Sequence, residues 1–136
     1  MTGLATPSIP VSWGELLDKL TILAIKRERI EAAAPRANVV REHALLHAAA
    51  AAALREPVVV DLVAQLRSVN ESLWEIEDAI RAEEANARFD ATFVALARSV
   101  YRKNDERAAI KHRINVALES DLVEEKSYWS AAQKTA

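Results

Sequence analysis

The chain has 136 residues, the usual size of one domain, and its composition is 51% apolar but only 5% aromatic, with two glycines. Strand-rich folds need glycine turns and β-branched or aromatic runs, so this composition excludes all-β and doubly wound folds. The lack of cysteine excludes disulfide scaffolds, and the near balance of 18 basic and 20 acidic residues argues against nucleic-acid binding. Because the sequence contains neither a membrane-length apolar run nor a basic N-terminal signal, we expect a cytoplasmic protein.

Residues 1–11 carry two prolines and no helical period, which predicts an extended N-terminal arm. Ser12 followed by Glu15 has the spacing of a capping box and predicts a helix start. The helical pattern continues to about Ala34, where Pro35 is expected to end it. Apolar residues occur on two sides of this first helix, which predicts burial on both sides.

A second helix is predicted from about Arg36 to Leu54, through six consecutive alanines, as a thin cover that buries little area. A third helix is predicted from residue 59 or 60 to Ala85. Its apolar residues alternate at spacings of four and three, which is typical of a packing seam with Leu73 near its centre. The seam comprises Leu62, Leu66, Val69, Leu73, Ile76 and Ile80.

After a tight connection, Asp90 is the expected N-cap of a fourth helix that ends near Glu119. Asp121 and Glu124 have the spacing of another capping box. This spacing predicts a short C-terminal helix through Trp129.

The predicted fold is therefore all-α: an antiparallel bundle of about four helices plus a short C-terminal helix, with two helices unusually long. A single helical domain covers residues 12–130, between the arm at residues 1–11 and a frayed tail at residues 131–136. Two such long helices exceed the width of a compact 15.0 kDa globule, so we predict a homodimer whose interface includes the first or third helix.

Polar residues line up beside the apolar seams of the third and fourth helices, and together they form a candidate ligand-binding groove. Guanidinium and ammonium groups bind oxyanions and amides fix orientation, so this set favours an anionic small ligand. The alternative is that these side chains pair with one another as a structural network. The candidates are Arg67, Asn70, Trp74, Glu77 and Arg81 on the third helix, and Tyr101, Asn104, Lys111 and Asn115 on the fourth.

If these two helices are antiparallel neighbours, Arg67 should approach Lys111 and Asn115. Two cations brought close together need an anion between them. We therefore expect Glu71, Asp18 or a bound anion at that position.

Two carboxylate pairs support an alternative function. Glu28 and Glu31 on the first helix, and Glu75 and Asp78 on the third, each share one helical face. Facing pairs of this kind could bind Mg²⁺ and a triphosphate, which resembles the motif of the all-α nucleoside-triphosphate pyrophosphohydrolases. The gap between the pairs is longer than in that family, and the usual doubled glutamate is missing.

The histidines do not lead us to predict a metal site. His43 and His47 have the i, i+4 spacing that can chelate zinc, with His112 as a third ligand, but the surrounding alanines offer no groups to orient the rings. We predict no catalytic residue, no metal and no cofactor.

Three segments together resemble a small bacterial family of uncharacterised all-helical proteins known as a domain of unknown function. The segments are VSWGELLDKLTILAIKRERI at residues 11–30, LRSVNESLWEIEDAIR at residues 66–81, and FVALARSVYRKNDERAAIKHRIN at residues 93–115 followed by LVEEKSY. The resemblance implies no known activity, but members tend to be encoded near glycosyltransferase and surface-polysaccharide genes.

We therefore expect a non-enzymatic, homodimeric interaction or anionic small-ligand-binding protein, accessory to surface-polysaccharide synthesis. The partners are a second copy of the chain and an anionic small molecule or a protein, without nucleic acid or a membrane span. The alternative is a Mg²⁺-dependent pyrophosphohydrolase.

Overall fold

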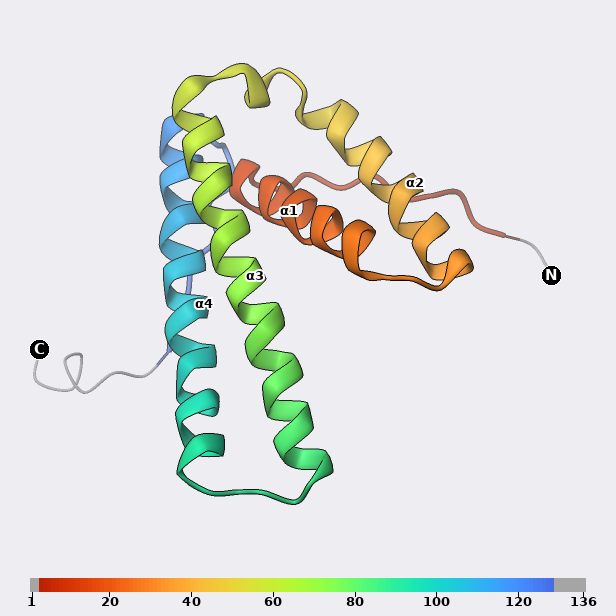
Figure 1. Cartoon of the computed structure of the whole chain (residues 1–136). Helices are drawn as coiled ribbons and strands as arrows, with labels where there is room; N and C mark the ends of the chain where they lie inside the picture. The colour runs from red at the N-terminus through yellow and green to blue at the C-terminus, as the bar shows by residue number, and fades with distance from the viewer. Residues whose placement is uncertain (1–2, 129–136) are drawn as a thin grey trace, which may run out of the picture.

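The computed structural model describes residues 3–128, and this part of the chain contains helices and no strands (Figure 1). The all-α prediction is therefore confirmed. The elements are α1 (Trp13–Arg29), α2 (Ala33–Ala50), the 3₁₀ helix η1 (Ala53–Arg55), α3 (Pro57–Ala85) and α4 (Ala91–Ala117).

The helices form two antiparallel hairpins that cross (Figure 1). The first hairpin is α1 with α2, and the second is the longer α3 with α4, which lie side by side along their length. Helix α1 packs against one half of the α3–α4 hairpin, and α2 packs against α1. The other half of the α3–α4 hairpin, which carries the connection between the two helices, projects beyond α1.

Helix α1 is the centre of the fold because it has neighbours on two sides: α2, and the pair α3 and α4. Leu17 and Leu20 of α1 join Leu66 of α3 and Ile114 of α4 in one buried cluster. The prediction of burial on both sides of α1 is confirmed, and the burial that suggested a dimer through this helix is supplied within one chain.

Prolines occur in the first turns of two helices, and Pro35 does not end α1 as expected. Helix α1 ends at Arg29, before the predicted Ala34, and Pro35 lies in the first turn of α2. Pro57 is likewise the first residue of α3. The first turn of a helix does not need the backbone N–H that proline lacks, and the fixed φ of proline suits that position.

The prediction of a C-terminal helix is wrong for the described residues, since residues 118–128 contain no helix. Helix α4 ends at Ala117, and Glu124 binds Lys111 instead of capping a helix beside Asp121. Trp129 and residues 131–136 lie outside the described part of the chain. Asp90 does cap α4, because its carboxylate accepts hydrogen bonds from two backbone N–H groups of the first turn.

The apolar seam of α3 is buried over only half its length. Leu66 is 0% exposed, and Leu62 and Val69 are also buried, but the seam residues from Leu73 onward are only half-buried. Toward its connection with α4, α3 projects beyond α1 (Figure 1), so α1 covers less of the seam there. The most deeply buried residue of the seam is therefore Leu66, although Leu73 lies nearer the middle of the seam in sequence.

None of the helices within residues 3–128 combines the length and apolarity needed to cross a membrane.

We predict that Leu66→Ala lowers the free energy of unfolding by about 2 to 5 kcal/mol, because it leaves a cavity in the best-packed part of the core. Leu73→Ala should cost less, since Leu73 already borders an open cavity. Urea unfolding of the variants measures both losses. The control is Val116→Ala, at a residue that is 64% exposed, which should stay within about 0.5 kcal/mol of the unmodified chain.

Candidate functional site

A buried polar network lies where α1 crosses α3 and α4. Asp18 Oδ1 accepts a hydrogen bond from Asn70 Nδ2 at 2.9 Å, and the same Nδ2 donates to Thr21 Oγ1 at 2.7 Å. Thr21 Oγ1 in turn donates to the backbone carbonyl of Asp18 at 2.7 Å. All three residues are buried, so these bonds replace the water that each side chain loses on folding.

Lys111 supplies the positive charge of this network. Its side chain is only 8% exposed, and its Nζ lies 2.7 Å from both Glu15 Oε2 and Glu124 Oε2 and 3.8 Å from Asp18 Oδ2. Arg107 Nε also lies 3.8 Å from Asp18 Oδ2. Burial lowers the pKa of Lys111, but the hydrogen bonds to Glu124 and Glu15 outweigh this effect, so the net pKa is raised and the ammonium stays charged.

Gly14 lets α1 come close enough to α4 to form this network. Its backbone N–H donates to Asn115 Oδ1 at 2.7 Å, and an added Cβ would lie 2.6 Å from the carbonyl oxygen of Lys111. No side chain fits in that space. Ser12 Oγ caps α1 by accepting from the backbone N–H of Glu15, which confirms half of the predicted capping box, while the Glu15 carboxylate binds Lys111.

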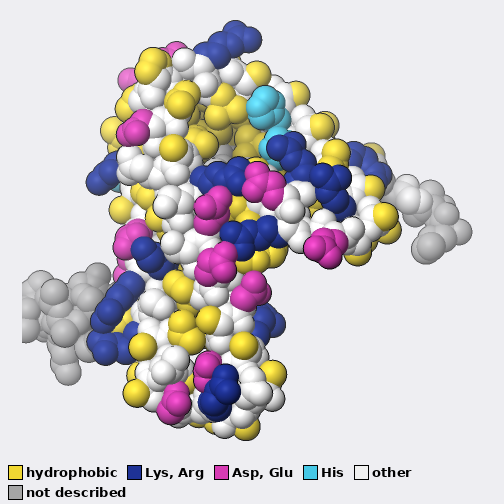
Figure 2. All heavy atoms as spheres, viewed as in Figure 1, with side chains coloured by type: hydrophobic (Ala, Val, Ile, Leu, Met, Phe, Trp, Pro, Cys, Tyr) yellow, Lys and Arg dark blue, Asp and Glu magenta, His cyan; other side chains and the backbone are white. Residues whose placement is uncertain are grey.

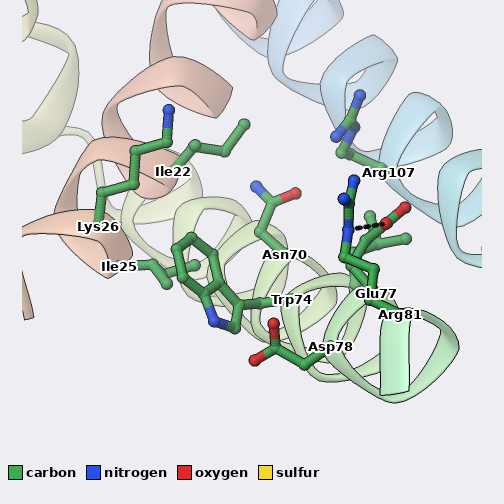
Figure 3. A pocket seen from close by; sticks show the side chains of 10 residues that line it. Ile22, Ile25, Lys26, Asn70, Trp74, Glu77, Asp78, Arg81 and Arg107 are labelled. Atoms are coloured by element: carbon green, nitrogen blue, oxygen red, sulfur yellow. Dashed lines mark ion pairs between the residues drawn. The ribbon is translucent and has the colours of Figure 1, made fainter. Parts of the chain in front are cut away.

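A cavity of about 390 Å³ opens beside the network, between α1, α3 and α4 (Figure 3). The Trp74 ring forms part of its wall, and Asn70 reaches the cavity from the network. Because both Asn70 hydrogen bonds within the described residues use Nδ2, its Oδ1 stays available as an acceptor. The remaining lining residues are Ile22, Ile25, Lys26, Leu73, Glu77, Asp78, Arg81 and Arg107.

Charges of both signs surround this cavity, and acidic and basic side chains gather over the hairpin crossing in Figure 2. Arg81 Nε lies 3.5 Å from Glu77 Oε2. Lys26, in contrast, has no carboxylate within 4.0 Å among residues 3–128, and Arg107 has only the 3.8 Å contact with Asp18. Arg29 lies over the Trp74 ring, 5.7 Å from its centroid. Lys26 and Arg107 are therefore the cations with most capacity for another anion.

The nine predicted ligand-binding residues do not form one groove. Four residues of α3 border the Trp74 cavity, whereas two residues of α4 border a second cavity of about 680 Å³, which Arg107 also lines. The first group is Asn70, Trp74, Glu77 and Arg81, and the second is Tyr101 and Asn104. Lys111 and Asn115 are buried in the polar network.

Arg67 does not take the predicted place beside Lys111. Its guanidinium binds Glu28 Oε2 at 2.6 Å and Glu71 Oε1 at 2.8 Å. Glu71 therefore pairs with Arg67, whereas Asp18 lies beside Lys111, and neither carboxylate joins the two cations. The expected bridge is wrong because each cation has carboxylates of its own.

The nine predicted site residues do not include Lys26 or Arg107. Arg107 follows Asn104 by three residues and precedes Lys111 by four, so helical spacing places all three on one line. This signal was sufficient to include Arg107. Lys26 comes from α1, and only the crossing of the hairpins brings it to the cavity, so no pattern along the chain identifies it.

The carboxylate pairs of the pyrophosphohydrolase hypothesis gain no support from the described residues. Glu28 is bound by Arg67 and Glu75 by Arg29, and no three Asp, Glu or His side chains within residues 3–128 are placed to hold a metal ion. His43 and His47 stack on each other with ring centroids 5.7 Å apart.

We predict that Gly14→Ala destabilises the chain by about 1 to 3 kcal/mol, because the new Cβ meets a backbone carbonyl that cannot rotate away. The gain of about 1 kcal/mol in helix propensity is smaller than this cost. Thermal unfolding measures the change. Gly3→Ala is the matched control, since nothing lies within 4 Å of its Cβ; equal stability of the two variants would contradict the close approach.

The second prediction for this region concerns how low pH changes the stability that the Glu124–Lys111 pair contributes. The hydrogen bond from Lys111 lowers the pKa of Glu124, burial opposes it, and the charges of Lys126 and Arg107 add to the lowering. A lowered folded-state pKa contributes stability above the unfolded value near 4.3, and this is lost as the pH falls through the folded value.

Glu124→Gln should therefore cost under about 1 kcal/mol at pH 7, because the Glu124 side chain is 43% exposed and water screens the pair. The difference from the unmodified chain should shrink below about pH 4.3. Urea unfolding across pH measures it, and Glu125→Gln, at a residue without an ion-pair partner in the described chain, should show no such trend.

Comparison with known proteins identifies a family for the chain but no individual relative. No curated protein is significantly similar to it. No solved structure matches it either. One family model matches residues 8–135, almost the whole chain and all four helices of the crossed hairpins, and its description is "Family of unknown function (DUF6165)". The chain belongs to this family.

Proposed function

We propose that the protein is a non-enzymatic binding protein for a small anionic molecule that carries a flat ring. The observation that carries the proposal is the Trp74 cavity of about 390 Å³. An indole ring and an amide oxygen of Asn70 border it, together with two cations that have few carboxylate partners, Lys26 and Arg107. Cavities of a few hundred Å³ with a largely apolar wall and a few polar groups are typical of small-molecule sites.

The cavity offers a distinct role to each kind of side chain. The Trp74 ring, packed under Arg29, provides a surface on which a flat ring can stack. Lys26 and Arg107 can receive an oxyanion, and Asn70 Oδ1 can accept a hydrogen bond from the ligand. Glu77 and Asp78 repel an anion placed at their edge of the cavity, so they favour one orientation of the ligand.

The resemblance described above suggests which ligands to try first. A role accessory to surface-polysaccharide synthesis would make nucleotide-sugars the natural candidates, since they combine a flat base with phosphates. Uridine diphosphate is the simplest probe of this class.

The binding test is titration with uridine diphosphate, followed by tryptophan fluorescence and thermal shift. Lys26→Met should weaken binding about tenfold, because a charged contact to a phosphate contributes about 1.5 kcal/mol. Lys103→Met is the matched control, since Lys103 does not line the cavity and pairs with Glu106. Trp74→Phe should remove most of the fluorescence change. Equal affinities of Lys26→Met and Lys103→Met would contradict the proposal.

The same titration distinguishes the alternatives. Stabilisation by a nucleoside triphosphate only when Mg²⁺ is present, with release of pyrophosphate, would favour the pyrophosphohydrolase. Absence of any shift with nucleotides or nucleotide-sugars would favour a protein partner.

The proposal includes a homodimer, supported by the large surface of the single chain. The chain exposes 9554 Å², whereas a compact 15.0 kDa monomer exposes about 7,000 Å². Residues 3–11 and 121–128, which are exposed, contribute to this excess. Helix α2 adds the exposed side chain of Leu45, and the proposed interface is on α2 instead of the predicted first or third helix, because α1 is already covered within the chain.

Light scattering should give twice the 15.0 kDa mass at micromolar concentration. Leu45→Glu should shift the mass toward the monomer, because it places a charge in the proposed interface. Val94→Glu, on the exposed surface of the projecting hairpin, is the control and should leave the dimer intact. A monomer at all concentrations would exclude this part of the proposal.

A further inference from the structure

Lys111 has more carboxylate neighbours than its charge requires. Glu15 and Glu124 each lie 2.7 Å from its Nζ, and Asp18 lies 3.8 Å away and also faces Arg107. Two cations therefore face three carboxylates. Loss of one carboxylate would leave Lys111 and Arg107 still balanced by the other two, so it would not leave an uncompensated buried charge.

Glu124 differs from the other two carboxylates in how it is held. Asp18 and Glu15 belong to α1, whereas Glu124 lies in the irregular segment after α4, in which residues 121–128 are all exposed. Ser120 anchors the beginning of this segment, since its N–H donates to the Asn115 carbonyl and its Oγ accepts from the N–H of Trp13. Beyond residue 122, the only hydrogen bonds or ion pairs to the helices among the described residues are those between Glu124 and Lys111.

The cavity beside this segment and the Trp74 cavity have one lining side chain in common. The second cavity, of about 680 Å³, is bordered by Glu124 and Lys126 of the segment and by Tyr101 and Arg107 of α4. Arg107 borders both cavities. Because Glu124 both binds Lys111 and borders this second cavity, movement of the segment away from α4 would leave Lys111 beside space that Arg107 also borders.

We propose that Glu124 occupies, from within the chain, an oxyanion site on Lys111, and that a second anionic group of the ligand takes this site when the segment 121–128 lifts. Lysine binds phosphate oxygens as a compact point charge, and a phosphate oxygen replaces a carboxylate oxygen without changing the sign of the contact. The ligand would then carry two anionic groups, as a diphosphate does, with Arg107 between them. This deepens the proposed function and rests on it for the ring-binding half of the ligand.

The first test uses inorganic pyrophosphate, a probe without a ring, at constant ionic strength. Glu124→Gln should bind it about three- to tenfold more tightly than the unmodified chain, because the internal competitor is weakened. Glu125→Gln changes the same charge on the same segment without touching Lys111 and should leave the affinity unchanged. Equal affinities of all three forms, or no binding by any of them, would overturn the proposal.

The second test follows the segment in the chain with Glu124 intact. Because the sequence contains no cysteine, spin labels can be placed at Ser127→Cys and Arg102→Cys without background labelling. Saturating pyrophosphate should lengthen and broaden the distance between the labels, as should Glu124→Gln without the probe. A distance that stays unchanged while pyrophosphate is bound would refute displacement of Glu124.

The two proposals fail in different ways. If Glu124→Gln tightens pyrophosphate binding, but Lys26→Met and Trp74→Phe leave the affinity for uridine diphosphate unchanged, the Lys111 site is supported and the ring-binding function is contradicted. If uridine diphosphate binding needs Lys26 and Trp74, but Glu124→Gln leaves the affinity for pyrophosphate unchanged, the Lys111 site is contradicted and the proposed function is supported.

Discussion

The close approach of α1 to α4 at Gly14 is the constraint on which the rest of the structure depends. With no side chain at this position, the first turn of α1 lies against the backbone of Lys111 and is held there by Asn115. That contact places Asp18, one turn further along α1, beside Lys111, Arg107 and Asn70. The polar network and the cavity next to it are therefore consequences of one missing side chain.

The helices themselves were largely predictable from the sequence because their signals are local. Asp90 caps α4 through hydrogen bonds that span at most three residues. The apolar spacing of α3 identifies its buried face, on which Leu66 lies. Pro35 and Pro57 show the limit of such signals, since proline suits the first turn of a helix as well as the residue after one. A local rule could not choose between the two.

The candidate site was only partly predictable, because the partner of a long charged side chain depends on how helices cross. Asn70 and Trp74 were identified from their line beside the seam, and both border the cavity. Arg67 lies on the same line, yet Glu28 of α1 binds it, and Lys26 reaches the cavity from α1. The spacing of Asp121 and Glu124 is typical of a helix start, but Glu124 instead binds the buried ammonium of Lys111, 13 residues earlier in the chain.

The projecting half of the α3–α4 hairpin has a consequence for how this fold can vary. At the end that carries the connection, the two helices lie side by side beyond α1, and their facing residues are half-buried. Seven residues make two turns of a helix and nearly restore its facing side. Paired insertions or deletions of seven residues, one in each helix near the connection at Asn86, would change the reach of the hairpin while preserving its register. The length of the projecting half of the hairpin is thus independent of the crossing at Gly14.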